Sequence, residues 1–285
     1  MESQSHDESW REPVAVVIPA RLEVTRIDRC LDGVLASTTD RRLDVLVVCN
    51  GPADDTEQRV ADREVDFVAR GWTLTVERID DHGKCASIRR GALRAAPGPL
   101  VVLDVRVGLR PDTLERLVAG AIDRALYYAS ARLDYVVEGD AVCRAFSRAY
   151  AASPFGRSHD LKGTCVFVAH ERRADLLVLP DVPAEDRYYL SLTPRDRRGT
   201  ISDSVVEYHF PTTARRLFDQ QMRWASANRA TVPVMDRHDR PDHVTDRRPY
   251  FGARPPRLAD RVVYGLLSGA ARVVARTRPM KIASW

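Results

Sequence analysis

An acid and a base stand close together at the end of an apolar run in GPLVVLDVRVGL, residues 98–109. Apolar residues lead to Asp104, and Arg106 follows two positions later. Side chains two apart on an extended chain point the same way. We therefore expect Asp104 and Arg106 to face one space. A guanidinium there is suited to forked contacts with phosphate or carboxylate groups.

Two further stretches carry residue types that could do chemistry. In AEDRYYL, Glu185 and Asp186 stand where a loop gives way to a helix. An aspartate there is either a helix N-cap or, facing a cleft, a group that takes a proton. In QQMRW, helical spacing puts Gln220, Arg223 and Trp224 on one face. The alternative for this helix is structural, with Trp224 buried and Arg223 paired with a carboxylate.

The elements that must position these residues follow from apolar patterning. We expect buried strands at 13–20, 43–51 and 100–104, an alternating strand at 73–79, and helices at 26–38, 54–71 and 84–96. Alternating strands and helices predict a parallel sheet with helices on both faces, an α/β fold. Ligands of such sheets bind beyond the carboxyl ends of the strands. The crevice is then lined by residues 19–23, 49–51, 80–84 and 104–106.

The second half is less regular. We expect a helix at 111–122, strands at 131–140 and 164–171, and a helix at 211–230. Residues 231–257 are charged and proline-rich, as in a linker, and residues 1–12 form a polar leader that we expect to be disordered. A last helix at 258–276 has an apolar stripe flanked by arginines. It is expected to dock on the domain; the alternatives are a homodimer contact or a membrane surface.

Composition limits the class of protein. At 285 residues, 44% hydrophobic and 29% charged, the chain is expected to form one domain with a tail. The net charge of +4 comes from dispersed arginines, which excludes a nucleic-acid stripe. Five scattered cysteines without a CxxC pair argue against a disulfide framework or a structural zinc site. No signal peptide and no run of eighteen apolar residues is present, so we expect a cytoplasmic protein without a transmembrane segment.

Six segments, taken in order, resemble the inverting GT-A glycosyltransferases of family 2. They are VAVVIPARLE, VVCNGPADDT, GKCASIRRGAL, VVLDVRV, AEDRYYL and QQMRW, between about residues 13 and 230. The resemblance implies a GT-A fold, with a nucleotide-sugar-binding half at 13–110 and an acceptor-binding half at 111–230. Residues 258–285 would form a C-terminal helix and tail. It also implies direct displacement at the anomeric carbon of a nucleotide sugar by an acceptor hydroxyl or amine.

The same resemblance assigns roles to residues. It implies Asp186 as general base, Glu185 as its support, Arg223 near the diphosphate, and Gln220 and Trp224 on the acceptor side. Donor contacts would come from Pro19, Ala20, Arg21, Glu23, Asn50, Asp80, Gly83, Lys84, Asp104 and Arg106. Uridine is the expected base, although Cys49 stands where an aspartate is usual, and Arg89 replaces the usual asparagine.

Arg106 is the main departure from the family pattern, because it replaces the second acid of the metal-binding DxD. Either Arg106 itself neutralises the diphosphate, or Asp104 holds Mg²⁺ or Mn²⁺ together with His209 or waters. The expected activity is transfer from a UDP-hexose or UDP-N-acetylhexosamine to a soluble acceptor: a secondary metabolite, a carrier-bound intermediate or a glycan. The alternative is a catalytically inactive GT-A-like subunit that binds a nucleotide sugar or acts as a scaffold. No GxGxxG or basic glycine-rich loop follows the first strand, which disfavours dinucleotide-binding and sugar-nucleotide-forming enzymes.

Overall fold

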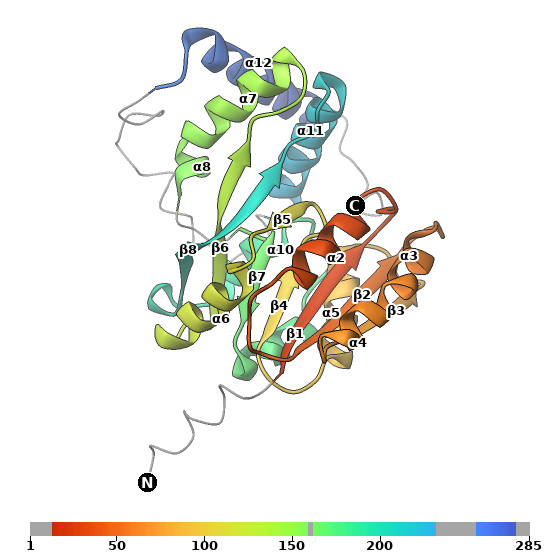
Figure 1. Cartoon of the computed structure of the whole chain (residues 1–285). Helices are drawn as coiled ribbons and strands as arrows, with labels where there is room; N and C mark the ends of the chain where they lie inside the picture. Colours follow the sequence, from red (N-terminus) through yellow and green to blue (C-terminus); the bar gives the residue numbers. More distant parts are fainter. Residues whose placement is uncertain (1–12, 159–161, 232–254, 278–285) are drawn as a thin grey trace.

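The computed structural model describes residues 13–158, 162–231 and 255–277. Its centre is an eight-stranded mixed sheet in the order β3-β2-β1-β4-β7-β6-β8-β5 (Figure 1). The strands are β1 (Val14–Ala20), β2 (Leu43–Asn50), β3 (Thr73–Ile79), β4 (Leu100–Leu103), β5 (Val107–Leu109), β6 (Tyr128–Val136), β7 (Cys165–Val168) and β8 (Arg198–His209). The first four are parallel, as predicted. The strands of the second half extend this sheet, and β7 pairs antiparallel with both β4 and β6.

Strand β1 is buried on both faces, which explains its unbroken apolar run. Val14, Val16 and Ile18 belong to one core cluster, and Ala15 and Val17 to the other. Helices α2 (Ile27–Leu35), α3 (Thr56–Asp62), α4 (Glu64–Ala69) and α6 (Thr113–Asp123) pack into the first cluster. Helices α5 (Lys84–Arg94) and α9 (Arg173–Leu177) pack into the second. The first half is thus the predicted layer of sheet between helices.

The helix predicted at 54–71 is interrupted. Arg63, with φ −96° and ψ −4°, ends α3 and precedes α4. Its guanidinium donates to Asp66 at 2.7 Å and to Asp32 of α2 at 2.6 Å. The break lets one arginine join α4 to α2, a tertiary contact that helical periodicity does not report.

Two long elements of the second half were not predicted. Helix α7 (Ala141–Ala152) is capped by Asp140, whose carboxylate accepts from the Cys143 N–H at 2.8 Å. Strand β8 pairs parallel with β6 and antiparallel with β5, and its register with β6 shifts between Ala131 and Arg132. The remaining helices are α8 (Pro154–Arg157), α10 (Glu185–Leu192), α11 (Ala214–Thr231) and α12 (Leu258–Thr277), with 3₁₀ turns at His170–Arg172 and Arg195–Arg197.

Helix α12 docks on the domain, as expected. It lies beside α7 and α11 at the end of the molecule to which β6 and β8 extend (Figure 1). Arg148 of α7 donates to buried Asp260 at 2.7 and 2.9 Å, and the ring centroids of Tyr264 and Phe146 are 5.3 Å apart. Among the described helices, none is long and apolar enough to cross a membrane. The predicted leader and most of the predicted linker lie outside the described residues.

Candidate functional site

A cavity of about 530 Å³ lies at the carboxyl ends of β1, β2 and β4. It is lined by nearly all residues expected to bind the donor: Pro19, Ala20, Arg21, Glu23, Asn50, Gly83, Lys84, Asp104 and Arg106. Glu185, Gln220, Arg223 and Trp224 also line it. Asp80 does not; it is exposed just after β3. We call this space the donor cavity. The topology rule for α/β sheets therefore located it correctly.

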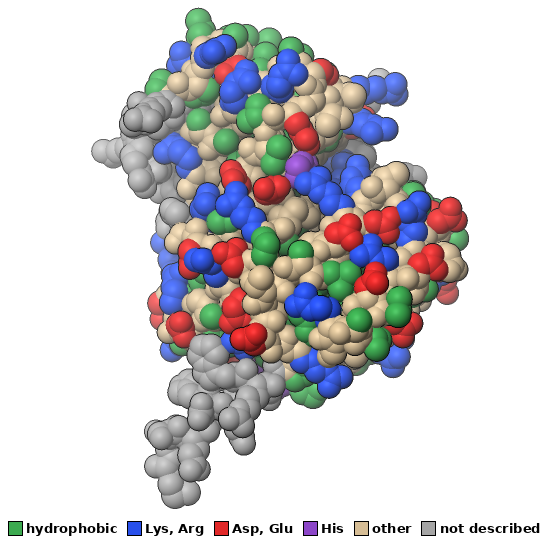
Figure 2. All heavy atoms as spheres, in the orientation of Figure 1, with side chains coloured by type: hydrophobic (Ala, Val, Ile, Leu, Met, Phe, Trp, Pro, Cys, Tyr) green, Lys and Arg blue, Asp and Glu red, His purple; other side chains and the backbone are tan. Residues whose placement is uncertain are grey.

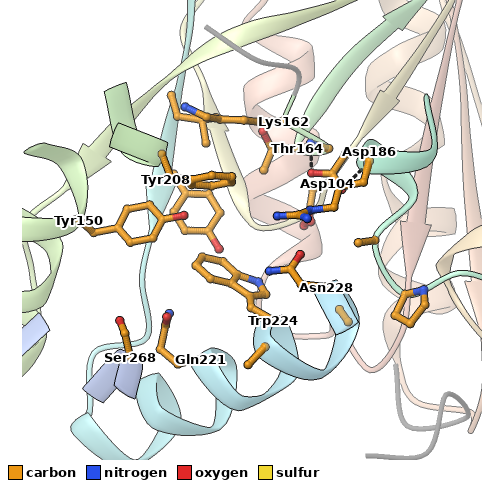
Figure 3. A pocket seen from close by; sticks show the side chains of 18 of the residues that line it. Asp104, Tyr150, Lys162, Thr164, Asp186, Tyr208, Gln221, Trp224, Asn228 and Ser268 are labelled. Atoms are coloured by element: carbon orange, nitrogen blue, oxygen red, sulfur yellow. Dashed lines mark hydrogen bonds between the residues drawn. The ribbon is translucent and has the colours of Figure 1, made fainter. Parts of the chain in front are cut away.

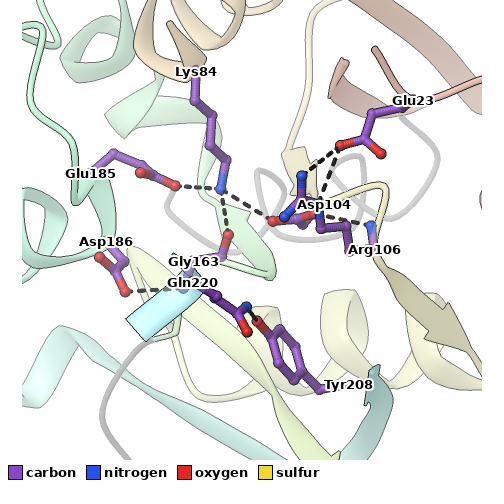
Figure 4. Close-up of polar contacts among 9 residues, drawn as sticks. All are labelled: Glu23, Lys84, Asp104, Arg106, Gly163, Glu185, Asp186, Tyr208 and Gln220. Atoms are coloured by element: carbon purple, nitrogen blue, oxygen red, sulfur yellow. Dashed lines mark hydrogen bonds and ion pairs between the residues drawn. The ribbon is translucent and has the colours of Figure 1, made fainter. Parts of the chain in front are cut away.

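Lys84, the first residue of α5, organises the charges of this cavity (Figure 4). Its ammonium forms a close ion pair with Glu185, lies 3.9 Å from Asp104 and donates to the Gly163 carbonyl at 2.8 Å. Burial works to lower the pKa of Lys84, but the attraction of Glu185 and Asp104 outweighs it and raises that pKa. Burial also raises the pKa of Glu185, against the opposing effect of Lys84. Lys84 thus stays charged and holds α5, β4 and α10 together.

We expected Asp104 and Arg106 to lie on one extended strand, but they do not. Strand β4 ends at Leu103 and the chain turns, with the Asp104 carboxylate accepting from the Arg106 N–H at 3.0 Å. Both residues still line the donor cavity. The Arg106 guanidinium reaches Glu23, donating at 3.0 and 3.2 Å, rather than Asp104. Arg106, at the second acidic position of the usual DxD, therefore forms an ion pair with Glu23 in the cavity wall.

Two guanidinium groups of the donor cavity, those of Arg106 and Arg223, lie near each other. Glu23 is buried and accepts from both Arg106 and, at 2.8 Å, Arg26. No hydrogen bond or ion pair joins Arg223 to another described residue. Burial lowers the pKa of Arg223, and the nearby Arg106 charge lowers it further. An anion between these two guanidinium groups would relieve their repulsion, so the arrangement suits a diphosphate.

Asp186 lines a second cavity of about 460 Å³. The N-cap of α10 is Ala184, so Asp186 lies inside the first turn and is not the cap. Its oxygens accept from the Gly163 N–H at 3.4 Å and from the Arg187 N–H at 2.9 Å. Lys84, Asp104, Glu185, Tyr208 and Trp224 line both cavities. The two cavities therefore adjoin at these residues, close to the Asp186 carboxylate.

Helix α11 presents the QxxRW residues as its spacing predicted. Gln220 is buried and donates to the Tyr208 hydroxyl at 2.7 Å, which fixes α11 against β8. Trp224 lies between the two cavities, and its ring centroid is 6.4 Å from that of Tyr208. Tyr208 was missed because β8 was not recognised. The alternation in SVVEYHF was the available signal.

His209 does not join Asp104. One ring nitrogen lies 2.8 Å from Glu138 and the other 2.5 Å from Arg29, and His209 lines neither cavity. In the part of the chain that the structure describes, no cluster of three or more His, Cys, Asp or Glu side chains could hold a metal ion. Asp104 is moreover flanked by Lys84 and the Arg106 backbone. The residues present do not fit a metal held by the protein as the family pattern requires.

The face shown in Figure 2 carries acidic and basic side chains interspersed over both halves of the molecule. Neither sign gathers into a continuous patch on that face. Inside the donor cavity, charged side chains of both signs lie together, among them Lys84, Arg106 and Arg223.

Comparison with known proteins agrees with this geometry. The family model described as "Glycosyl transferase family 2" matches residues 15–163, more than half of the chain. A search among curated proteins found no match.

Solved structures share the fold at low identity. The mannosyltransferase PcManGT from Pyrobaculum calidifontis, in complex with GDP-Man and Mn²⁺, aligns with a TM-score of 0.59 at 20% identity over 96% of this chain and 78% of that one. S. aureus TarS 1–349 in complex with UDP-GlcNAc aligns with a TM-score of 0.55 at 13% identity, covering 91% and 80%. Against the longer TarS chain, the TM-score is 0.53 at 14% identity, and the match covers 75% of this chain and 39% of that one. The order of elements, the site at the strand ends and the family match agree: this chain is a glycosyltransferase with a GT-A fold and belongs to glycosyl transferase family 2.

Proposed function

We propose that this chain transfers a sugar, with inversion, from a UDP-hexose or UDP-N-acetylhexosamine to a hydroxyl or amine of an acceptor, with Asp186 as the general base. One observation carries the proposal: Asp186 lines the second cavity next to Glu185, which lines both cavities, and the guanidinium groups of Arg106 and Arg223 line the first. Residues 13–110 then supply most donor contacts, and residues 111–230 supply the acceptor side.

The reaction is a single displacement. The acceptor oxygen or nitrogen forms a bond to the anomeric carbon while the bond from that carbon to the diphosphate oxygen breaks. The acceptor proton passes to the Asp186 carboxylate. Arg106 and Arg223 stabilise the charge that develops on the departing diphosphate. Lys84 holds Glu185 and Asp104 in place beside the reacting centre.

In this proposal, guanidinium groups take the place of a divalent metal. The structure of PcManGT contains Mn²⁺, and family members of this fold often use such ions. Here Arg106 stands where the second metal acid would be, and it is bonded to Glu23. The competing proposal is that Asp104 holds Mg²⁺ or Mn²⁺ largely through waters.

Asn50 offers an acceptor to a nucleobase N–H. Its side-chain N–H donates to the Ser87 hydroxyl at 2.7 Å, which fixes the orientation of the amide. Its buried Oδ1 has no hydrogen-bond partner among the described residues, and Asn50 lines the donor cavity. A ring N–H such as that of uracil would satisfy this acceptor. UDP-GlcNAc is the ligand of the TarS structure, which makes UDP sugars the first donors to test.

The test compares Asp186→Asn with the wild type on UDP-glucose, UDP-galactose and UDP-N-acetylglucosamine, with GDP-mannose as a contrasting donor. Slow donor hydrolysis, in which water replaces the acceptor, is followed by release of UDP. We expect Asp186→Asn to lower the turnover rate by about 10²–10⁴-fold. Its dissociation constant for the donor, measured by calorimetry, should change less than threefold.

Asp196→Asn is the matched control, because that side chain is 80% exposed. It should behave as the wild type. An Asp186→Asn variant with undiminished turnover would remove Asp186 as the base. Retention of the anomeric configuration in the product, read by NMR, would refute direct displacement.

A further inference from the structure

We infer that the acceptor is a compact, largely apolar molecule with a ring body and one nucleophilic hydroxyl or amine, and not a sugar chain. The inference rests on the proposed function and is carried by the second cavity, which we call the acceptor cavity. At about 460 Å³, this cavity has the size of a site for a small organic molecule.

The direction of the acceptor cavity follows from its two ends. Asp104 and Asp186 lie at one end and Ser268 of α12 at the other (Figure 3). The nucleophilic group of an acceptor must lie at the Asp186 end. The body of the molecule then extends along the cavity toward α12.

The walls between these ends are aromatic and packed against one another. The ring centroid of Tyr150 lies 5.3 Å from that of Tyr135 and 5.7 Å from that of Trp224. Tyr208 adds a ring 5.9 Å from Tyr135. Figure 3 shows Tyr150, Tyr208 and Trp224 surrounding the middle of the space. Rings that support each other in this way form a rigid apolar surface suited to a flat hydrocarbon body.

The acidic charges of the acceptor cavity are confined to one end, while Lys162, Arg187 and Arg272 are its other charged lining residues besides Lys84. Among its described lining residues, the carboxylates are Asp104, Glu185 and Asp186, all at the junction with the donor cavity. Lys162 is buried, and its ammonium donates to the carbonyls of Gly156 at 3.2 Å and Ser158 at 3.1 Å. The aromatic stretch therefore offers no acid to hydroxyl groups.

Few buried side-chain atoms of the described lining residues lack a hydrogen-bond partner. Tyr135 Oη, Thr164 Oγ1 and Gln221 Nε2 are buried and have no hydrogen-bond partner among the described residues. A sugar ring carries a hydroxyl on most of its carbons, and each buried hydroxyl left unpaired costs about 1–3 kcal/mol. These three atoms suit a molecule with two or three polar groups. The aromatic walls are therefore better matched to an aromatic compound with two or three polar groups than to a sugar chain.

Helix α12 supplies the far wall through Tyr264, Ser268 and Arg272. Ser268 is half-buried and distant from the donor cavity, so a larger side chain there would occupy acceptor space alone. Ala270 lies on the same helix, is exposed and does not line the cavity. Ser268→Phe and Ala270→Phe are thus a matched pair.

The experiment offers the full chain a UDP sugar with 4-methylumbelliferone or naringenin as ring acceptors, and maltotriose or cellobiose as sugar acceptors. We expect transfer to a ring acceptor with a kcat/KM at least tenfold above that for either sugar. Ser268→Phe should lower this kcat/KM at least tenfold, mainly through KM. Donor hydrolysis and donor affinity should stay within twofold. Ala270→Phe should match the wild type throughout.

Preferential transfer to the sugars, or equal behaviour of the two α12 variants, would overturn the inference. Binding of naringenin in the absence of a donor, measured by calorimetry, tests the inference separately from the proposed function. If naringenin binds to the wild type and not to Ser268→Phe while no UDP sugar is turned over, the proposed function fails and the inference about the cavity stands.

Discussion

The exchange of an acid for an arginine at position 106 changes the charge balance of the whole donor cavity. Glu23 is 4% exposed, and its one negative charge is shared by Arg26 and Arg106. Arg223 adds a further guanidinium that burial and Arg106 render less stable as a cation. The free protein is therefore prepared for a ligand with two negative charges. A metal ion at Asp104 would add positive charge beside Lys84, which already lies 3.9 Å from that carboxylate.

The position of Arg106 predicts two outcomes, one for the variant Arg106→Ala and one for the wild type treated with a chelator. We expect the variant to lose about 10²–10³-fold in turnover, because one fixed donor to the leaving group is gone. The wild type should keep its activity in excess EDTA. Turnover of a UDP sugar with and without EDTA measures both effects.

Arg110→Ala is the control, because the Arg110 side chain is 42% exposed and pairs with Asp134 outside the donor cavity. Loss of wild-type activity in EDTA, restored by Mn²⁺, would contradict the guanidinium proposal. Such a result would favour a metal held at Asp104.

At the scale of residues, sequence predicted well where a strand end fixes the position. Glu23, Asn50 and Asp104 follow buried strands, and all three line the donor cavity. His209 was placed by analogy alone, and Glu138 and Arg29 bind its ring instead. Tertiary partners of this kind are brought together across a gap of 71 or 180 residues, which local spacing cannot report.

At the scale of elements, burial decides what could be predicted. Strands β1, β2 and β4 are buried on both faces and appear as continuous apolar runs. Strand β8 is buried only in part, with exposed Ser202 and Asp203 in its middle, and its register with β6 shifts. A strand with polar residues at a register shift has neither a run nor a clean alternation. The acceptor half was therefore harder to predict than the donor half.

Helix α5 links packing to function, because it carries Lys84 at its first residue and Gly91 two turns later. A Cβ at Gly91 would lie 2.2 Å from Val17 Cγ1 and 2.7 Å from Val17 Cγ2 of β1. We expect Gly91→Ala to push α5 from the sheet and to lower the free energy of unfolding by about 1–3 kcal/mol. Donor affinity should fall as Lys84 moves. Chemical denaturation and calorimetry measure the two effects.

Gly265→Ala in α12 is the matched substitution, since a Cβ there meets nothing within 4 Å. Alanine favours a helix over glycine by about 1 kcal/mol, so this variant should be slightly more stable than the wild type. Equal stability of both alanine variants would show that α5 tolerates the extra atom. The close approach of α5 to β1 would then not control the position of Lys84.

At the scale of the whole molecule, the acceptor cavity is assembled from distant parts of the chain. Residues of β6, α7, β8 and α11 form its walls, and α12 closes it from residue 258 onward. The sequence alone predicted that α12 would dock, from its apolar stripe. It could not identify the whole surface on which α12 docks, because α7 forms part of that surface beside α11 and was not recognised. The far wall of the acceptor cavity thus depends on the docking of α12.

The contact between Arg148 and Asp260 makes that docking dependent on pH. The hydrogen bonds from Arg148 hold the pKa of Asp260 below its ordinary value of 3.8. A carboxyl whose pKa is lowered by folding stabilises the native state above its ordinary pKa, and the effect is lost as the pH falls through the native value. We therefore expect Asp260→Asn to be less stable than the wild type at pH 7, by roughly 2 kcal/mol. Their melting temperatures should converge as the pH falls below about 4.

The same substitution tests whether α12 completes the acceptor side. Released from Arg148, α12 should open locally, so hydrogen exchange at pH 7 should rise in peptides of α7 and α12 and stay unchanged in β1 and β2. Acceptor KM should rise severalfold while the donor dissociation constant stays constant, because Tyr264 and Ser268 line the acceptor cavity only. Asp203→Asn, at a carboxylate that is 64% exposed, is the control. If donor and acceptor binding weaken together, α12 stabilises the whole domain and is not a separate wall of the acceptor site.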